Sequence, residues 1–188
     1  MAFLFLNSCL LIVDFQDFFT DRRSRGYVKG AAGVKPELKK LIRGFLHKGL
    51  PVFATRHFNI EDETDPFFKF YGKVIGQEDP GFELSPPVSE FRKIEVFEKS
   101  GYSPFLSAPL LKWLRKRKVK NIYLTGALLE KCILAASFDA FQRGFDVFVV
   151  KDCVLSRKRR LKKNALEIIA RSCGKIVSTK QVLKNEGR

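Results

Sequence analysis

NIYLTGALLEKCILAASFDAFQRGFDVFVVKD, residues 121–152, contains two apolar runs on either side of a helical pattern. The runs at 121–128 and 145–152 are rich in β-branched and aromatic residues, as buried strands are, and residues 131–143 between them are expected to form a helix. A strand, a helix and a strand in this order predict a right-handed crossover between two parallel strands.

The same alternation extends along the rest of the chain. Further strands are expected at residues 3–13, 50–55, 93–99 and 175–179, and further helices at 35–49, 108–118 and 160–174. Residues 58–93 have weak periodicity and are rich in Pro and acidic residues, with four of the eight prolines and eight of the 20 acidic residues, so we expect loops and short turns there. The sequence therefore predicts one α/β domain over residues 1–188, with a mostly parallel, Rossmann-like central sheet between two helix layers.

The net charge of the 188-residue chain is +15, and the basic excess lies in three runs, at 21–30, 112–121 and 151–164. Loops or exposed helix ends are expected at these runs, so a solvated surface is the simplest interpretation. No zinc-finger spacing or aromatic-interleaved basic motif accompanies the charge, and a nucleic-acid partner is not expected. A basic nucleic-acid-binding module is kept as an alternative, and steering of an anionic substrate is a third interpretation.

Composition also indicates where the protein works. No segment has the roughly 20 consecutive apolar residues that cross a membrane, and the apolar N-terminus lacks the basic leader and cleavage site of a signal peptide. The four cysteines Cys9, Cys132, Cys153 and Cys173 form no CxxC pair. We therefore expect free thiols, a cytoplasmic location, and neither a membrane nor a cofactor as partner.

Three residues that could perform chemistry each stand at the carboxyl end of an expected strand: Asp14, Lys99 and Cys132. Ligands of such folds bind beyond these strand ends, so the three side chains are expected to converge. A cysteine at the first turn of a helix, beside a lysine, favours the thiolate, and a carboxylate can accept the thiol proton. Taken alone, Cys132 would more often be a buried apolar filler and Lys99 a solvated lysine, and the joint placement favours function.

Several segments carry a resemblance to the isochorismatase-like cysteine hydrolases, the group that includes nicotinamidases and N-carbamoyl amide hydrolases. The similar segments follow the family's order over nearly the whole chain: LLIVDFQDFF (10–19), KGLPVFATRHFN (48–59), GQEDPGFEL (76–84), VFEKSGYSPF (96–105) and the stretch 121–156. The resemblance implies an isochorismatase-like fold and a dimer or tetramer.

By the same resemblance, Asp14 is the general base, Lys99 the charged partner and Cys132 the nucleophile of an Asp-Lys-Cys triad. A cis peptide bond is implied between Ala127 and Leu128, and its use would be to turn the Leu128 N–H toward the same point as that of Cys132. The two amides would then form an oxyanion hole. Phe19 and Phe105 are expected to line the substrate pocket.

The chain departs from the family pattern at two places. Metal-using nicotinamidases have an Asp-x-His pair where this chain has His57, Phe58 and Asn59, and the only other histidine is His47, so no metal site is expected. Leu129 and Glu130 replace smaller or amide-bearing residues beside the cysteine.

We therefore predict a metal-independent hydrolase of a C–N bond in a small amide or ureide, acting through a thioester. A vinyl-ether hydrolase of the isochorismatase type, in which Asp14 acts and the cysteine is incidental, is the competing enzyme hypothesis.

Overall fold

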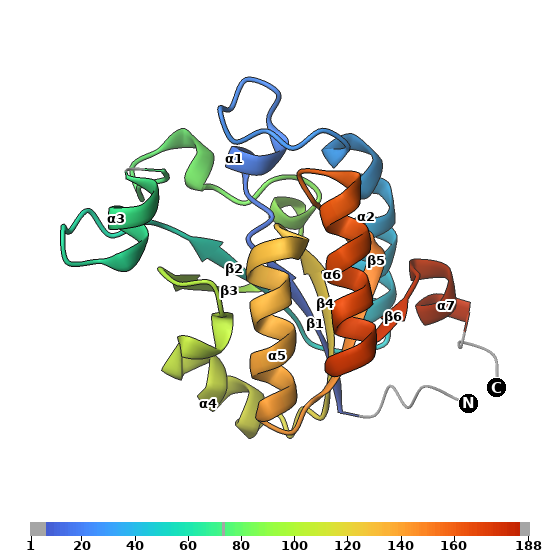
Figure 1. The fold of residues 1–188 in the computed structure, drawn as a ribbon. Helices are drawn as coiled ribbons and strands as arrows, with labels where there is room; N and C mark the ends of the chain where they lie inside the picture. Colours follow the sequence, from blue (N-terminus) through green and yellow to red (C-terminus); the bar gives the residue numbers. More distant parts are fainter. Residues whose placement is uncertain (1–6, 73, 185–188) are drawn as a thin grey trace.

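The computed structural model describes residues 7–72 and 74–184 and contains one six-stranded sheet (Figure 1). Its strands are Ser8–Val13 (β1), Val52–His57 (β2), Glu95–Lys99 (β3), Asn121–Gly126 (β4), Asp146–Val154 (β5) and Lys175–Val177 (β6). Their spatial order is β3-β2-β1-β4-β5-β6, and every neighbouring pair is parallel. The predicted α/β class is confirmed, and the sheet is wholly parallel.

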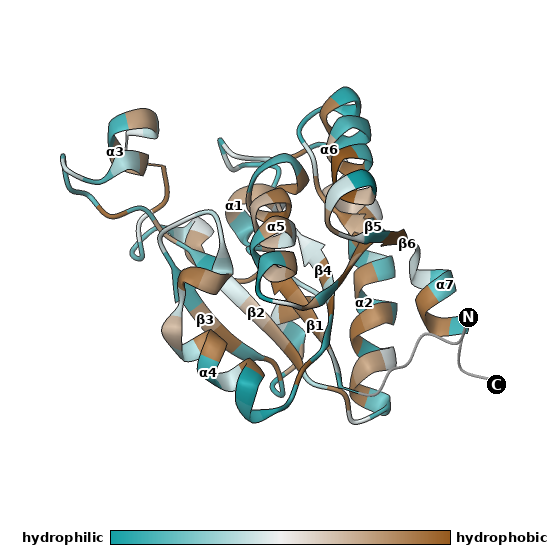
Figure 2. Cartoon of the chain, turned by 60° about the horizontal axis from the view of Figure 1, so that its bottom comes forward, coloured by the Kyte–Doolittle hydropathy of each residue, from teal (hydrophilic) through white to brown (hydrophobic). Residues whose placement is uncertain are grey.

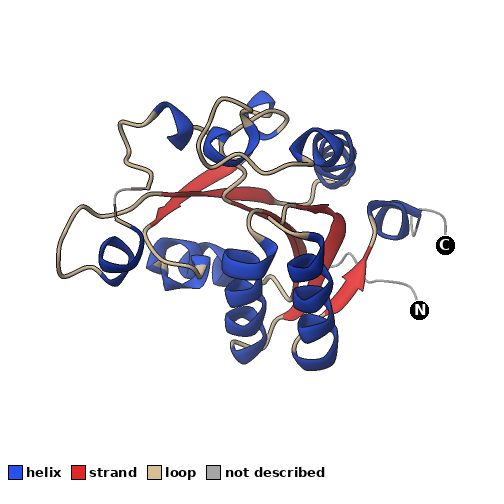
Figure 3. Cartoon of the chain, turned by 45° about the horizontal axis from the view of Figure 1, so that its top comes forward, coloured by secondary structure: helices blue, strands red, loops and turns tan. Residues whose placement is uncertain are grey.

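Helices cover both faces of this sheet (Figure 3). They are Asp17–Thr20 (α1), Ala31–His47 (α2), Pro66–Tyr71 (α3), Ala108–Lys116 (α4), Leu134–Gln142 (α5), Arg159–Ser172 (α6) and Thr179–Lys184 (α7), together with a π-helical turn at Leu129–Ile133 that leads into α5. Helices α4, α5 and α6 lie on one face, and α2 and α7 on the other. The predicted three-layer arrangement is confirmed.

Strand β1 shows why two helix layers form. Its side chains alternate between the faces: Leu10 and Ile12 pack against α2, whereas Cys9, Leu11 and Val13 pack toward α4 and α5. All five are fully buried, so each face contributes a separate core. Figure 2 shows the matching hydropathy, with apolar strands in the centre and helices that are polar on part of their surface.

Local differences from the sequence expectation have local causes. The helix expected at 35–49 begins earlier, at Ala31, and Pro36, which was expected at its start, lies inside its second turn. The short helices α1, α3 and α7 were not predicted, since elements of four to six residues have no resolvable period. The strand expected at 3–13 begins in part outside the described residues.

The strand order places a topological switch between β1 and β4. From β1 the chain proceeds outward to β2 and β3 on one side, and from β4 to β5 and β6 on the other. The connections therefore diverge at the carboxyl ends of β1 and β4, which opens a crevice there. In the described part of the chain, no helix combines the length and apolarity needed to cross a membrane.

Candidate active site

Asp14 follows the last residue of β1, at the switch point. Its backbone has a φ of 47°, a left-handed conformation that ends the strand. Thr55 holds the carboxylate, because its hydroxyl donates to Asp14 Oδ1 at 2.7 Å while the Asp14 N–H donates to Thr55 O at 3.1 Å. The Asp14 side chain is 1% exposed, so it is an almost fully buried carboxylate that must be paired.

Lys99, the last residue of β3, supplies the pairing charge. Its Nζ lies 2.7 Å from Asp14 Oδ2, 2.8 Å from the carbonyl oxygen of Gly101 and 3.8 Å from Cys132 Sγ. Burial works against the charged form of Lys99, but the charge of Asp14 and the hydrogen bonds with Asp14 and Cys132 outweigh it and raise the lysine pKa. The ammonium therefore stays protonated between the carboxylate and the sulfur.

Cys132 lies in the π-helical turn that follows β4, and its side chain is partly exposed. Desolvation by the surrounding protein raises the pKa of its thiol to about 12. Lys99 and a backbone hydrogen bond from Leu128 lower this pKa, whereas the charge of Asp14 and a hydrogen bond with it raise it. The expectation that the thiolate is favoured is therefore not met, and the resting group is a thiol beside a carboxylate.

The backbone between β4 and Cys132 is tightly constrained. Gly126 has a φ of 107°, and a Cβ at this position would stand 2.0 Å from the carbonyl oxygen of Val13, so only glycine fits. The peptide bond between Ala127 and Leu128 is cis. The hydrogen bond from the Leu128 amide places that N–H beside the sulfur, which is where a second donor to a reacting oxygen would be needed.

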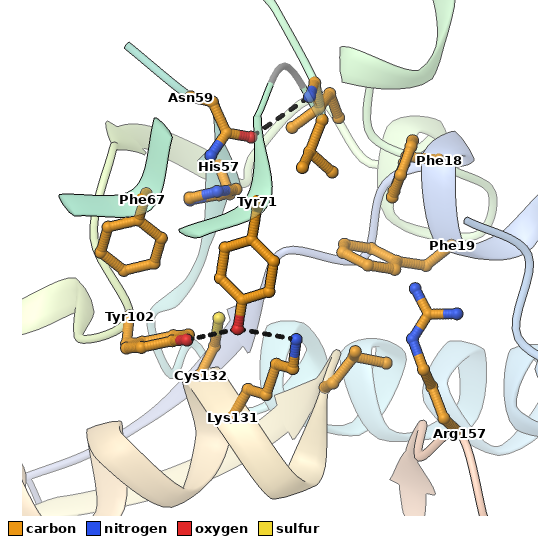
Figure 4. Close-up of a pocket in the computed structure, with 13 residues that line it drawn as sticks. Phe18, Phe19, His57, Asn59, Phe67, Tyr71, Tyr102, Lys131, Cys132 and Arg157 are labelled. Carbon is orange, nitrogen blue, oxygen red and sulfur yellow. Dashed lines mark hydrogen bonds between the residues drawn. The ribbon is translucent and has the colours of Figure 1, made fainter. Parts of the chain in front are cut away.

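A cavity of about 130 Å³ opens above the sulfur. Thirteen residues line it: Phe18, Phe19, His57, Asn59, Phe67, Tyr71, Val74, Ile75, Tyr102, Leu128, Lys131, Cys132 and Arg157. Most are aromatic or aliphatic, and the few polar groups stand among them, as in small-molecule sites in general (Figure 4).

A chain of polar contacts crosses this cavity. The Tyr71 hydroxyl lies 2.7 Å from that of Tyr102 and accepts a hydrogen bond of 3.1 Å from Lys131 Nζ (Figure 4). The same ammonium lies 4.4 Å from the centroid of the Tyr71 ring. Helix α3, which has no buried residue of its own, is thus joined through Tyr71 to the turn that carries Cys132.

The structure brings together Asp14, Lys99 and Cys132, and it places Phe19 in the pocket wall. It does not bring Phe105 there. That ring is 1% exposed and stacks on Phe145 in the core, because the short turn capped by Ser103 directs it inward.

The two unusual residues beside the cysteine have different places. Leu129 is fully buried in the core under α5 and does not reach the cavity. Glu130 Oε1 accepts a hydrogen bond of 2.9 Å from the backbone N–H of Arg157. Neither side chain is among those that line the pocket.

The donors near the end of β2 do not fit a metal site. His57 Nδ1 is buried without a hydrogen-bond partner, but Asn59 Oδ1 accepts from the Ile75 N–H at 3.2 Å and Phe58 offers no donor atom. His47 is the last residue of α2 and shortly precedes the start of β2, so it lies toward the amino ends of the strands, away from the site. Within residues 7–72 and 74–184, no group of three His, Cys, Asp or Glu side chains could hold an ion.

Sequence reasoning missed most of the pocket wall. Tyr71 lies in the excursion that showed weak periodicity. Arg157 lies in a basic run interpreted as solvated surface, and its side chain is exposed there but also lines the pocket. Lys131 directly precedes Cys132 in the sequence, and this adjacency could have indicated that Lys131 lies near the pocket. Burial lowers the pKa of His57 to about 4, aided by the charge of Lys99, and this neutral state follows from tertiary contacts alone.

The isochorismatase domain model matches residues 8–181, which is nearly the whole described chain. The chain belongs to the isochorismatase family. Among the relatives of this chain, an uncharacterized isochorismatase family protein of Bacillus subtilis is 33% identical over 81 residues. The matched stretch covers 43% of this chain and less than half, 44%, of that protein. The nicotinamidase/pyrazinamidase of Mycobacterium tuberculosis is 26% identical over 160 residues, 76% of this chain and 83% of that protein.

The fold of this isochorismatase-family chain also matches solved structures. A cysteine hydrolase from Pseudomonas syringae superposes with a TM-score of 0.90 at 20% identity, covering 98% of this chain and 94% of that one. At this identity the likeness concerns the fold. Family membership makes the chain a relative of hydrolases that include nicotinamidases.

Proposed function

We propose that this chain is a metal-independent cysteine hydrolase that cleaves a C–N bond of a small amide or ureide through a thioester intermediate. The observation that carries the proposal is the contact of three charged or nucleophilic groups at one end of a small pocket. Lys99 Nζ lies 2.7 Å from Asp14 Oδ2 and 3.8 Å from Cys132 Sγ, and only the sulfur lines the cavity.

The first half of the reaction makes the thioester. Because the thiol pKa is about 12, the proton leaves during attack, not before it, and Asp14 accepts it as Cys132 Sγ bonds to the carbonyl carbon. The carbonyl oxygen gains a negative charge, which the N–H groups of Leu128 and Cys132 would stabilise. Collapse of this intermediate breaks the C–N bond, and the proton on Asp14 passes to the leaving nitrogen.

The second half consumes water. Asp14, again a carboxylate, takes one proton from the attacking water while the hydroxide oxygen bonds to the thioester carbon. The C–S bond then breaks, Sγ recovers the proton from Asp14, and the carboxylic acid leaves. Lys99 stays protonated throughout, and its ammonium remains 2.7 Å from Asp14 Oδ2.

The test is a screen of small amides and ureides for ammonia release, with the acyl enzyme trapped and located by mass spectrometry. We expect the added mass on the peptide that contains Cys132. Turnover should fall by about 10³-fold or more in Cys132→Ala, because the nucleophile is lost. Cys173→Ala is the matched control, since Cys173 is 5% exposed and lies outside the pocket.

Two outcomes would favour the alternatives. Full turnover by Cys132→Ala would contradict the thioester route and favour a reaction in which Asp14 acts without the thiol, as in the competing vinyl-ether hydrolase hypothesis. An acyl group on another cysteine would contradict the assignment of Cys132 as the nucleophile. A chain that turns over no amide but binds RNA at low salt, with affinity lost as salt rises, would favour the nucleic-acid-binding module.

A further inference from the structure

The charges that line the pocket have one sign. Among the described lining residues, Lys131 and Arg157 carry full positive charges, and none is an Asp or Glu. His57 is neutral at physiological pH because its pKa is lowered to about 4. The side chains of Lys131 and Arg157 both extend into the cavity (Figure 4). Arg157 is exposed at the rim and Lys131 is half-buried, so both charges are accessible to an anion that enters the cavity, and a neutral substrate would use neither.

Arg157 is held at the rim by the backbone around it. Leu155 donates to the Gly126 carbonyl at 2.8 Å and accepts from the Leu129 N–H at 2.7 Å, and the Arg157 N–H donates to Glu130 Oε1. Glu130 therefore acts on the loop and leaves the guanidinium free. Within the described chain, that guanidinium has neither an ion pair nor a hydrogen bond, although eight other cationic side chains form ion pairs with acidic residues.

Lys131 is oriented but not neutralised. Its Nζ donates to the Tyr71 hydroxyl and lies over the Tyr71 ring, and no carboxylate pairs with it in the part of the chain that is described. An ammonium has three N–H donors, so two remain for a ligand. Tyr71 thus turns the ammonium toward the cavity instead of toward solvent.

The dimensions of the cavity limit what can approach these two cations. Its volume of about 130 Å³ is slightly less than that of the engineered cavity of about 150 Å³ that holds one benzene molecule. Phe19, Phe67 and Tyr71 form its walls, which suits a flat or short-chain molecule. A carboxylate is the small planar anion that matches the fork of an arginine.

We propose that the substrate is a carboxylate-bearing small amide or ureide, whose carboxylate binds Arg157 and Lys131 while its carbonyl carbon lies at Cys132. This proposal rests on the proposed amide hydrolysis. In this proposal Arg157 and Lys131 select substrates that carry a negative charge, and Glu130 is the residue that positions Arg157.

The test compares acids with their methyl esters: succinamate with methyl succinamate, and N-carbamoylglycine with its methyl ester. Each pair shares the scissile group and differs in the anion. We expect kcat/KM for the acid to exceed that for the ester by roughly tenfold or more, as for hydrogen bonds to a charged group. Arg157→Gln should remove most of this preference, and Lys131→Met should reduce it.

Arg159→Gln is the matched control. It removes the same charge two residues away, on an exposed side chain that does not line the cavity, and it should retain the preference for the acid. Glu130→Ala should weaken the preference because the Arg157 loop loses its anchor, and Glu130→Gln, which keeps an acceptor oxygen, should restore it. A structural role for Glu130 alone would change kcat/KM for acid and ester equally.

Calorimetric binding to the Cys132→Ala variant separates this proposal from the proposed hydrolysis. If the acids bind about tenfold more tightly than the esters and Arg157→Gln abolishes that difference, the anion site stands even where no turnover is seen. Equal binding of acid and ester, or a preference unchanged in Arg157→Gln, overturns it. Esters turned over as well as acids would overturn it as well, while leaving the proposed hydrolysis in place.

Discussion

Replacing Asp14 by Asn should change the reactivity of Cys132 and the turnover of substrate in opposite directions. In the native site the carboxylate both raises the thiol pKa and cancels the nearby charge of Lys99. Removal of the carboxylate charge leaves the ammonium acting on the sulfur alone, at 3.8 Å. The thiol should therefore ionise more readily, although the base that the proposed reaction needs is gone.

The charge of Lys99 already lowers the native thiol pKa, so the expected change is the loss of the Asp14 contribution. Asp14 Oδ2 lies 2.7 Å from Lys99 Nζ, which lies 3.8 Å from Cys132 Sγ, so the carboxylate oxygen is within about 6.5 Å of the sulfur. Two unit charges at that separation interact by about 2.5 kcal/mol at an effective dielectric constant of about 20, and we therefore expect a decrease of about 2 units from the value near 12. About 100-fold more thiolate, each roughly tenfold less nucleophilic, gives a net rate increase of about tenfold.

The assay is the rate of modification of Cys132 by methyl methanethiosulfonate across pH 6–9, measured by mass spectrometry on the peptide that contains Cys132. Asp146→Asn is the matched control, because it removes a carboxylate on an exposed side chain at the start of β5, at the end of the sheet opposite the site. Modification of Asp14→Asn at or below the native rate would refute the proposed electrostatics. So would amide turnover that survives in this variant.

Three further changes test the surroundings of the site. His57 should make the fold lose stability in acid, because its pKa is about 4 in the folded protein and 6.5 in the unfolded chain. Between these values the unfolded chain binds more protons, so the free energy of unfolding should fall by up to about 3 kcal/mol from pH 6.5 to pH 4. His57→Gln should remove this dependence on pH. Thr55→Val keeps the shape but deletes the 2.7 Å hydrogen bond to Asp14, and urea denaturation should show a loss of about 2 kcal/mol. Gly126→Ala places a methyl group 2.0 Å from the Val13 carbonyl oxygen and should cost at least about 4 kcal/mol in thermal or urea unfolding.

Controls for these changes lie in the same chain. His47→Gln, at an exposed helix end, should leave the acid slope intact. Gly33→Ala, inside α2 with no atom within 4 Å of the added Cβ, should stabilise the fold by roughly 0.5 kcal/mol. A flat acid profile in the native protein, an unchanged stability of Thr55→Val, or a tolerated Gly126→Ala would each contradict the contacts described above.

The expected element order and the expected convergence of Asp14, Lys99 and Cys132 came from local patterns. Long apolar runs and helical spacing are properties of contiguous residues, and the ends of parallel strands meet at one edge whatever the side chains are. Phe105 was expected in the pocket wall because it follows the lysine motif closely. The direction of the Phe105 side chain depends on the short turn that Ser103 caps and on stacking against Phe145. Neither could be predicted from the order of the motifs in the sequence.

The thiol state of Cys132 could not be predicted for a similar reason. Its place near a helix start and beside a lysine indicated a lowered pKa, but the amount of water removed from the sulfur is set by residues brought from several elements. The position of Arg157 at the pocket rim depends on tertiary contacts as well. Its basic run indicated an exposed side chain, which the structure has, but the hydrogen bond from its backbone N–H to Glu130 was not predictable from the sequence.

The amino-acid sequence by itself determined the α/β class, the parallel sheet and the three residues that meet at its edge, because those follow from periodicity and from the geometry of strand ends. Tertiary structure alone decided the ionisation of the thiol, the aromatic walls and the single sign of charge in the pocket. Those properties depend on distances between residues far apart in the chain, and burial and electrostatic energies respond to such distances, not to sequence spacing.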